Sequence, residues 1–405
     1  MKYKVHVNNS FGVVVGIVRI QLQAIEQSDG LEQVEFIVEL VGDQLIDNIS
    51  KIVVPAETHE SWIGFHSHLL ENNVYKIRWS ANEDSGEVEV RVRNTGDLAE
   101  KVSTQLNKDS VNLFLTGPCD TSLYNYNEQD IIPWYDKDNY HRTLDSLIHA
   151  NKIDQKLEPC FRQFLDEGWF EIENHVEAEL LDRLLVDLEH AAANGDSGFT
   201  PGSSQRLQRM HLKYQSFWDL TTYNKTQNIL DQLMQVPTTV SQIIAFVNGT
   251  QQAAHQDTVH LTVYPRGYMC GAWVALEDVQ PDSGELLVYP RSHRWDAVTM
   301  NDFGIQKVHN GQWTEFLSTV GGKWQSMIND SGVEPFIYRP KAGSLLVWHD
   351  RLMHGGSVRN NTDLTRKSCV THHFAQGSVV FYDSTGLPGR TIERDENRML
   401  GSLGK

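Results

Sequence analysis

Residues 255–295 read HQDTVHLTVYPRGYMCGAWVALEDVQPDSGELLVYPRSHRW, and this stretch decides the fold class. Its apolar residues alternate with polar ones or form short blocks between glycine and proline turns, which is typical of β-strands. His255 and Asp257 stand two residues apart at its start. Side chains two apart in a strand point to the same side, so we expect both groups to face one space. They are either a hydrogen-bonded pair at a strand end or two ligands of a metal site that needs a further ligand.

The chain around this stretch changes from helical to strand-like character. Residues 139–195 have helical periodicity interrupted by one short strand, and the chain after residue 240 is mostly strand-like. Helices followed by many short strands predict a mostly β fold, a barrel or double-sheet roll buttressed by flanking helices. Residues 296–335 form a long insertion between strands, which is expected to be a lid, a binding segment or a disordered loop.

The N-terminal part of the chain has its own pattern. Six alternating or β-branched segments predict a β-sandwich, at residues 3–9, 13–25, 34–41, 61–69, 74–81 and 87–94. A connector rich in turn formers and aromatic residues follows, so we place a domain boundary near residue 125. The prediction is an accessory β-sandwich-like domain at 1–125 and a second domain at 126–405, with a helical buttress at 139–195, a barrel at about 165–380 and the lid insertion at 296–335. The sandwich is interpreted as a brace, with a carbohydrate-binding or dimer-forming module as the alternatives.

Composition restricts the class of protein. The chain of 405 residues is 40% hydrophobic and carries a formal net charge of −18, which disfavours general binding to nucleic acid or to an anionic membrane. The longest apolar stretch, near GVVVGIV (12–18), is far too short to span a membrane, and the N-terminus lacks a signal-peptide core. Four cysteines form no CxxC motif and no regular framework. We therefore expect a cytoplasmic protein without nucleic-acid or membrane partners, and a homodimer stays open.

A third metal ligand and a cation lie further along the chain. His354 follows the strand-like residues 343–349 and precedes a Gly-Gly pair, and Arg366 follows twelve residues later. A mononuclear non-haem iron(II) centre uses two histidines and one carboxylate on one face of the metal. A dicarboxylate co-substrate would then need a planar arginine fork for its far end. His349 is the rival for the distal ligand. His372 and His373 lie on the last predicted strand, where one of them must face inward, and they are interpreted as packing or supporting residues.

Two segments carry a family resemblance. Residues 255–295 and 343–368 resemble the phytanoyl-CoA dioxygenase family of iron(II)/2-oxoglutarate oxygenases, within a similarity that covers roughly 155–380. The resemblance implies a double-stranded β-helix of the jelly-roll or cupin-like type, with Fe(II), 2-oxoglutarate and O2 as cofactor and co-substrates. By position it implies the iron ligands His255, Asp257 and His354, the 2-oxoglutarate-binding Arg366, and the pocket residues Ser357, Gln256 and Trp273. Two glycines precede Ser357 where the family has one, which weakens that assignment.

The function that follows is an oxygenase. It would hydroxylate a C–H bond of a small molecule or carrier-bound metabolite and release succinate and CO2. Asp257 occupies the position that related halogenases leave open for halide, which favours hydroxylation. The alternatives are a non-catalytic ligand- or sugar-binding protein on the same scaffold, and a metal-dependent cupin enzyme without co-substrate, which would not need Arg366.

Overall fold

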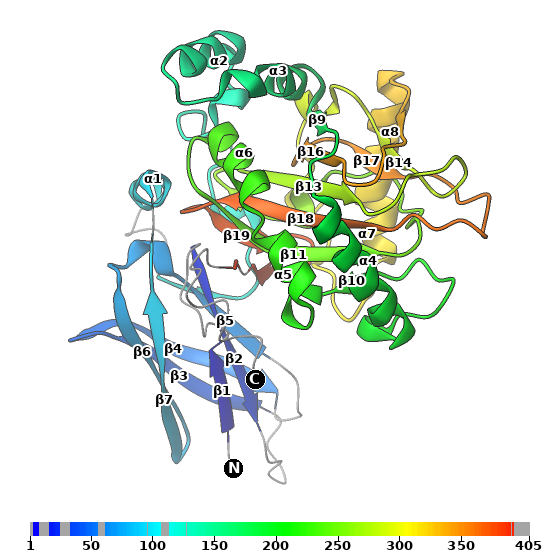
Figure 1. The fold of residues 1–405 in the computed structure, drawn as a ribbon. Coiled ribbons are helices and arrows are strands. Elements are labelled where there is room, and N and C mark those ends of the chain that lie inside the picture. Colours follow the sequence, from blue (N-terminus) through cyan, green and yellow to red (C-terminus); the bar gives the residue numbers. More distant parts are fainter. Residues whose placement is uncertain are drawn as a thin grey trace.

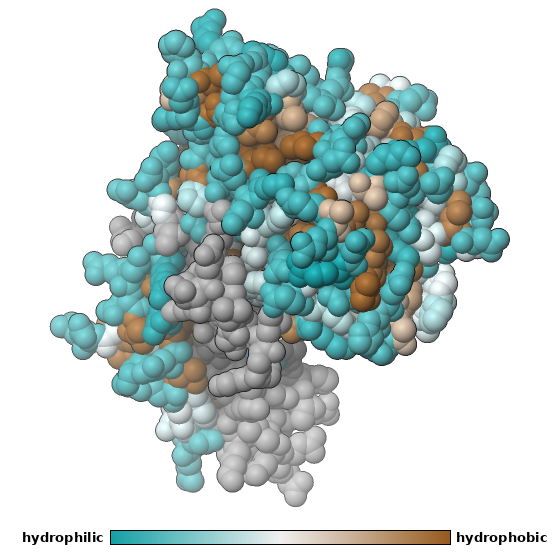
Figure 2. Space-filling view, viewed as in Figure 1, coloured by the Kyte–Doolittle hydropathy of each residue, from teal (hydrophilic) through white to brown (hydrophobic). Residues whose placement is uncertain are grey.

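The computed structural model describes residues 3–7, 16–24, 33–55, 61–94, 96–106, 113–126, 128–389 and 391–392 of the chain. The strands from the first part of the sequence gather below the remaining elements in Figure 1, where helices surround the upper sheets. Hydrophilic side chains predominate on the face drawn in Figure 2, and hydrophobic ones form separate small patches. No helix of the described residues is long and apolar enough to cross a membrane.

The N-terminal strands form two antiparallel sheets around a shared core. Their orders are β1-β2-β5-β8 and β4-β3-β6-β7. In β6 every second side chain from Tyr75 to Ala81 is buried, and these pack with residues such as Ile20 and Phe65 of the other sheet. That alternation is the reason for a two-layer arrangement. The strands are β1 (Tyr3–Val7), β2 (Ile17–Ala24), β3 (Gln33–Val41), β4 (Leu45–Pro55), β5 (Ser61–His66), β6 (Asn73–Ala81), β7 (Asp84–Val92) and β8 (Phe114–Thr116).

The sequence did not predict every element of this region. Strand β4 and helix α1 (Asp97–Gln105) were not expected. Residues 8–9, 13–15 and 25 of the predicted strands lie outside the described residues. Helix α1 buries Leu98 and Val102 in the same cluster as the core of the second part of the chain. The domain boundary near residue 125 therefore stays a prediction.

Two further sheets face each other and enclose the site. The larger has the order β10-β11-β18-β13-β16-β9 and the smaller β15-β14-β17. Trp273 and Val370 of the larger sheet pack with Leu286 and Val288 of the smaller one. This is the double-sheet roll that the sequence predicted. The strands of both are β9 (Trp169–Ile172), β10 (Leu207–Gln208), β11 (Thr238–Phe246), β13 (Met269–Ala275), β14 (Leu286–Val288), β15 (Phe336–Tyr338), β16 (Leu345–His349), β17 (His354–Gly356) and β18 (Ser368–Ala375), while β12 (Thr262–Tyr264), β19 (Val379–Tyr382) and β20 (Leu387–Pro388) form a third sheet.

Helices cover the opposite face of the larger sheet. The helical region predicted at 139–195 contains α2 (Tyr140–His149), α3 (Glu158–Glu167) and α4 (Ala178–Ala193), and α5 (Gln215–Thr221) and α6 (Asn224–Met234) follow. Leu184 and Leu188 of α4 pack in one core with Ile243 of β11 and Val347 of β16. The neighbours of these two strand residues, such as Ile244 and Trp348, point to the other face of the sheet and belong to the core between the two sheets. The period of two in each strand thus separates a helix-facing core from a site-facing surface.

The insertion at 296–335 is ordered and helical. It contains α7 (Thr314–Phe316), the π-helical turn η10 (Leu317–Gly321) and α8 (Gly322–Ser331). Phe316, Val320 and Trp324 pack with Val259 and Met353, which lie beside the predicted metal ligands in sequence. Of the three expectations for this segment, the disordered loop is wrong.

Candidate active site

His255 and Asp257 do not share a strand face, in contrast to the prediction. His255 forms a single antiparallel bridge with His354 of β17, in which its N–H donates to the His354 carbonyl at 2.9 Å. Asp257 begins the 3-10 helix η7 (Asp257–Val259), and its carbonyl accepts from the Leu261 N–H at 2.8 Å. The strand prediction was wrong because the backbone after His255 closes local hydrogen bonds instead of pairing with a neighbouring strand, and β12 starts only at Thr262.

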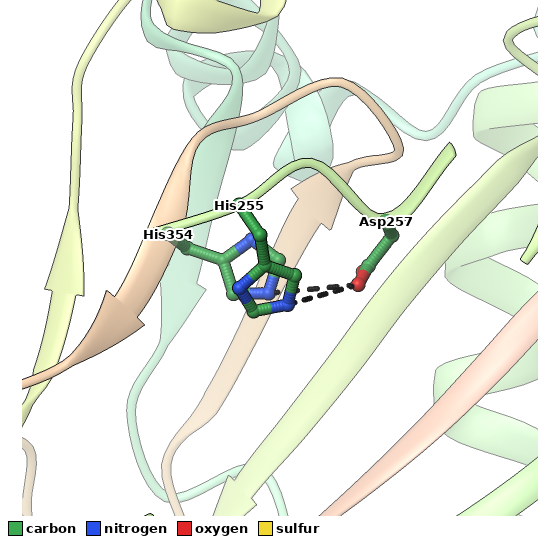
Figure 3. A group of neighbouring side chains, drawn as sticks. All are labelled: His255, Asp257 and His354. Atoms are coloured by element: carbon green, nitrogen blue, oxygen red, sulfur yellow. Dashed lines mark ion pairs between the residues drawn. The ribbon is translucent and has the colours of Figure 1, made fainter. Parts of the chain in front are cut away.

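The turn nevertheless brings the three predicted ligands together. His255 Nε2 lies 3.6 Å and His354 Nε2 lies 3.7 Å from Asp257 Oδ1. One ligand atom from each residue lies within 4.8 Å of the others, and all three residues are buried. Figure 3 shows both imidazoles turned toward the carboxylate. Among the described residues, this is the one group of three or more His, Cys, Asp or Glu that could hold a metal ion.

Hydrogen bonds fix the orientation of these side chains. The Nδ1 atom of His255 lies 3.0 Å from the Ala253 carbonyl, and that of His354 lies 2.9 Å from the Leu352 carbonyl. A carbonyl only accepts, so both Nδ1 atoms carry the proton and each Nε2 atom presents a lone pair, which in His255 accepts a hydrogen bond of 3.2 Å from Gln252 Nε2. The second oxygen of Asp257 accepts a hydrogen bond of 2.8 Å from Trp348 Nε1. Such partners hold metal ligands in place.

The electrostatics of the group favour one charge state. Burial disfavours the Asp257 carboxylate, but the His354, His255 and His372 rings outweigh burial and hold the pKa of Asp257 well below its usual value. Burial lowers the pKa of His354 to about 4, although Asp257 acts in the opposite direction. At neutral pH Asp257 is therefore a carboxylate and His354 a neutral imidazole, which are the protonation states that bind metal.

Arg366 is a buried cation that has no carboxylate in salt-bridge contact among the described residues. It is 2% exposed, and its guanidinium carbon lies 5.6 Å from the Trp273 ring and 5.7 Å from the Phe246 ring. Its Nε atom has no hydrogen-bond partner, and no carboxylate of the described residues lies within 4.0 Å of the guanidinium. Burial lowers the pKa of Arg366 to about 10, although the more distant carboxylates of Glu277 and Glu285 act in the opposite direction and raise it. A buried guanidinium in this state favours binding of an anion.

The other predicted pocket residues divide into two groups. Trp273 lines the same cavity as the three clustered residues and Arg366. Ser357 does not line it, because its hydroxyl donates to Glu285 Oε2 at 2.8 Å. Gln256 is also absent from the lining, since its amide donates to the Asp296 and Arg351 carbonyls, each at 3.2 Å.

The remaining histidines of this region have separate environments. His349 lies between two carboxylates, with Nε2 3.2 Å from Asp136 Oδ1, and it is not part of the three-residue group. His372 faces the site, with Nε2 3.7 Å from Asp257 Oδ2, and His373 Nε2 lies 2.9 Å from Thr371 Oγ1. The prediction that one of His372 and His373 faces inward is confirmed.

A cavity of about 650 Å³ opens from the cluster and includes residues that the sequence did not indicate. Trp348 could have been found from strand alternation, once the inward face was known. Arg206, next to β10, and His260, just after η7, carry no local signal that marks them. The lining also contains Trp313, Phe316 and Trp324 of the insertion.

Comparisons with known proteins agree with the resemblance. Residues 161–368, just over half of the chain, match the family model described as phytanoyl-CoA dioxygenase (PhyH). Phytanoyl-CoA dioxygenase domain-containing protein 1 of Danio rerio is 24% identical over 257 residues, which cover 60% of this chain and 84% of that protein. Its homolog in Caenorhabditis briggsae is 25% identical over 202 residues, with 47% and 67% covered. The Mus musculus protein is 27% identical over 177 residues, with 42% and 57% covered.

The solved structures that match the chain are more distant in sequence. The non-heme alpha ketoglutarate dependent carbocyclase SnoK from nogalamycin biosynthesis matches with a TM-score of 0.46 and 15% identity, over 60% of this chain and 95% of SnoK. EctD from S. alaskensis with 2-oxoglutarate and 5-hydroxyectoine matches with a TM-score of 0.43 and 16% identity, over 58% and 80% of the two chains.

Proposed function

The chain belongs to the phytanoyl-CoA dioxygenase (PhyH) family, and from that premise we propose that it is a non-haem iron(II)/2-oxoglutarate-dependent dioxygenase. In this proposal His255, Asp257 and His354 hold Fe(II), and Arg366 binds the distal carboxylate of 2-oxoglutarate. The enzyme hydroxylates a C–H bond of a small-molecule or carrier-bound substrate with O2, and releases succinate and CO2.

The donor set fits iron(II). Two imidazole nitrogens and one carboxylate oxygen converge from one side, which matches the two-histidine, one-carboxylate set of oxygenases. Both Nε2 atoms carry a lone pair toward the site because the Nδ1 protons are donated to backbone carbonyls, and metal binding would replace the hydrogen bond from Gln252 to His255 Nε2. The side without protein ligands opens into the cavity, where co-substrate and substrate would bind.

Arg366 is the observation that carries the choice of co-substrate. A metal-dependent cupin enzyme without 2-oxoglutarate would have no use for a buried guanidinium in this cavity. The planar fork matches a carboxylate with two parallel hydrogen bonds. No carboxylate of the described residues lies within 4.0 Å of the Arg366 guanidinium. A bound anion would therefore also compensate the positive charge of this buried side chain.

The residues around the site have distinct tasks in this reaction. Bound iron supplies the oxidising chemistry. Asp257 stays ionised through the working pH range, and His354 stays neutral well above pH 4, so neither has to lose a proton before binding metal. Trp348 fixes the carboxylate through Oδ2, and the apolar walls formed by Ile244, Leu286 and their neighbours limit access of water.

We also propose that the strands before residue 125 brace the catalytic part without contributing a ligand. The cavity-lining residues run from Arg206 to Thr385, which supports this assignment.

The direct test is iron-dependent turnover of 2-oxoglutarate. Purified protein would be loaded anaerobically with Fe(II), exposed to O2 and 2-oxoglutarate, and assayed for succinate. We expect succinate from the wild type and none from His354→Ala, while His309→Ala, a change of an exposed histidine outside the cavity lining, keeps the wild-type rate. A folded, iron-loaded protein that releases no succinate would refute the proposal and favour a non-catalytic binding protein.

A further inference from the structure

One buried lysine joins three segments that are far apart in the sequence. The Nζ atom of Lys307, in the insertion, lies 2.7 Å from Asp120 Oδ2 and 2.7 Å from Asp383 Oδ1. Asp120 belongs to the connector, and Asp383 directly follows β19. The Lys307 side chain is 9% exposed, and the Asp383 side chain is completely buried. Removing one partner of a buried ion pair leaves an uncompensated charge, so this lysine couples the three segments.

Further hydrogen bonds between the same segments surround the lysine. The second oxygen of Asp383, Oδ2, accepts from the Met300 N–H at 2.8 Å, at the start of the 3-10 helix η9 (Met300–Asp302). On the connector side, Asn301 Nδ2 donates to Thr121 Oγ1 at 2.8 Å. The connector, the beginning of the insertion and the end of β19 therefore meet at one junction.

The charges of this junction depend on Lys307. Burial would raise the pKa of Asp120, but hydrogen bonds from Lys307 and from the Ser122 backbone outweigh burial and hold this pKa below its usual value. Burial also raises the pKa of Asp383, and Lys307 acts in the opposite direction. Without the lysine, two neighbouring carboxylates would repel each other.

The junction lies beside the rim of the cavity. The Val308 N–H donates to the Ser384 carbonyl at 2.7 Å, and the Ser384 N–H donates to the Val259 carbonyl at 2.8 Å. Ser384 lines the cavity, and Val259 ends the turn that begins at Asp257. A line of backbone hydrogen bonds thus runs from the residue after Lys307 to the turn that carries a proposed metal ligand.

The residues around the junction also support the aromatic rings of the insertion. Met300 and Val308 are buried in one cluster with Phe316 and Trp324. These two rings line the cavity, and the Trp324 ring lies 6.1 Å from the His255 ring. The position of the rings over the cavity therefore depends on Met300 and Val308 staying in place.

We propose that Lys307 is a positioning residue through which the N-terminal part of the chain holds the insertion over the cavity. The brace proposed for that part of the chain then acts through Asp120 on the wall of the cavity where the substrate would bind. The inference rests on the proposed function where it concerns turnover, because a covered cavity limits access of water to the reaction. The contacts of Lys307 themselves do not depend on iron.

The test is hydrogen exchange of the whole chain, followed by mass spectrometry of peptides that cover residues 314–331. In Lys307→Met these amides should exchange about ten-fold faster or more, as expected for the loss of a hydrogen bond to a charged group. Asp120→Asn should speed exchange in the same peptides, although Asp120 lies outside the insertion. Lys307→Arg keeps the charge and should retain part of the protection. The control is Lys341→Met, which removes an exposed ion pair of 2.8 Å with Asp278 and should leave exchange unchanged.

Two further measurements separate positioning from a general loss of stability. Lys307 lies outside the proposed iron ligands and does not contact Arg366, so Lys307→Met should keep the Michaelis constant for 2-oxoglutarate within about two-fold of the wild type. The amides of β11 and β18 in the larger sheet should exchange as in the wild type, because the junction does not include these strands.

Four results would overturn the inference. These are unchanged exchange of residues 314–331 in folded Lys307→Met, faster exchange there that is matched in β11 and β18, no change of exchange in Asp120→Asn, or a large rise in the Michaelis constant for 2-oxoglutarate. If Lys307→Met does not fold, Asp120→Asn decides, since it keeps the lysine and its pair with Asp383. Exchange is measured without turnover, so absence of succinate release refutes the proposed function and leaves the role of Lys307 in placing the insertion to be judged by exchange alone.

Discussion

Trp348→Phe is a sharp test of the proposed metal site, because it changes no ligand. Trp348 is 3% exposed and donates from Nε1 to Asp257 Oδ2 at 2.8 Å, and its ring lies 4.6 Å from the His354 ring. Phenylalanine keeps an aromatic ring in the strand but removes the donor. A hydrogen bond to a charged group contributes about 1.5–3 kcal/mol, and replacing a supporting partner of a metal ligand weakens metal binding about 10- to 100-fold. We expect the dissociation constant for Fe(II) to rise by that factor.

The assay is an anaerobic Fe(II) titration with a competing chelator, and the same sheet offers a matched control. Trp169 pairs with Trp348 across β9 and β16 and is also buried, but its Nε1 has no hydrogen-bond partner. Trp169→Phe therefore loses a comparable indole without losing a contact to the site, and it should keep the wild-type affinity. The reasoning would be refuted if Trp348→Phe folded normally and bound Fe(II) within about two-fold of the wild type, a difference well below that expected for this hydrogen bond.

Other perturbations test the co-substrate anchor, the buried histidines and the domain boundary. Arg366→Gln should raise the apparent Michaelis constant for 2-oxoglutarate about thirty-fold or more, since losing one partner of a buried charged pair costs on the order of 2–5 kcal/mol; an unchanged constant in steady-state kinetics would move the anchor elsewhere. Burial lowers the pKa of His175 to about 4 in the folded protein. Between that value and about pH 6.5 the unfolded chain therefore binds more protons at this residue than the folded protein does. The free energy of unfolding should accordingly rise by about 1–2 kcal/mol between pH 5 and 7 because of His175. Urea denaturation should show a smaller rise in His175→Gln, and an equal rise would contradict this assignment. A chain of residues 97–405 keeps α1 and Tyr126, whose hydroxyl donates to the backbone of β12 at 2.7 Å, and should bind Fe(II). A chain of residues 131–405 loses both and should unfold at lower urea concentration; equal midpoints for the two would support the predicted boundary near residue 125.

The residues that sequence analysis brought forward share one property: their chemistry is encoded locally. His255 and Asp257 are two positions apart, and His354 and Arg366 belong to one strand-loop-strand segment. Their convergence did not require the predicted strand, because the bridge between His255 and His354 and the turn at Asp257 position the side chains instead. The three side chains thus lie together although the predicted local conformation of His255 and Asp257 was wrong, and their role as metal ligands stays a prediction.

Residues whose position depends on tertiary register could not be found in the same way. Arg206 reaches the cavity because β10 pairs with the edge of β11, and no pattern near residue 206 specifies that pairing. The assignment of Ser357 relied on transferring a position across an added glycine. Its hydroxyl instead contacts Glu285, which also pairs with Arg339. A one-residue change in a loop is enough to redirect a side chain, because successive residues of an extended chain point to opposite sides.

The acidic composition of the chain and the cationic cavity are compatible for a physical reason. A net charge of −18 resides mainly on solvated side chains, whose fields are screened within about 8 Å at physiological ionic strength. Inside the cavity, Arg206 and Arg366 face one carboxylate, Asp257, and water screens their charge less. If Fe(II) binds as proposed, the metal and the guanidinium groups would attract anionic ligands locally, whereas the net negative charge disfavours polyanions such as nucleic acid. On this proposal the charges that line the cavity, and not the net charge of the chain, decide which ligand binds.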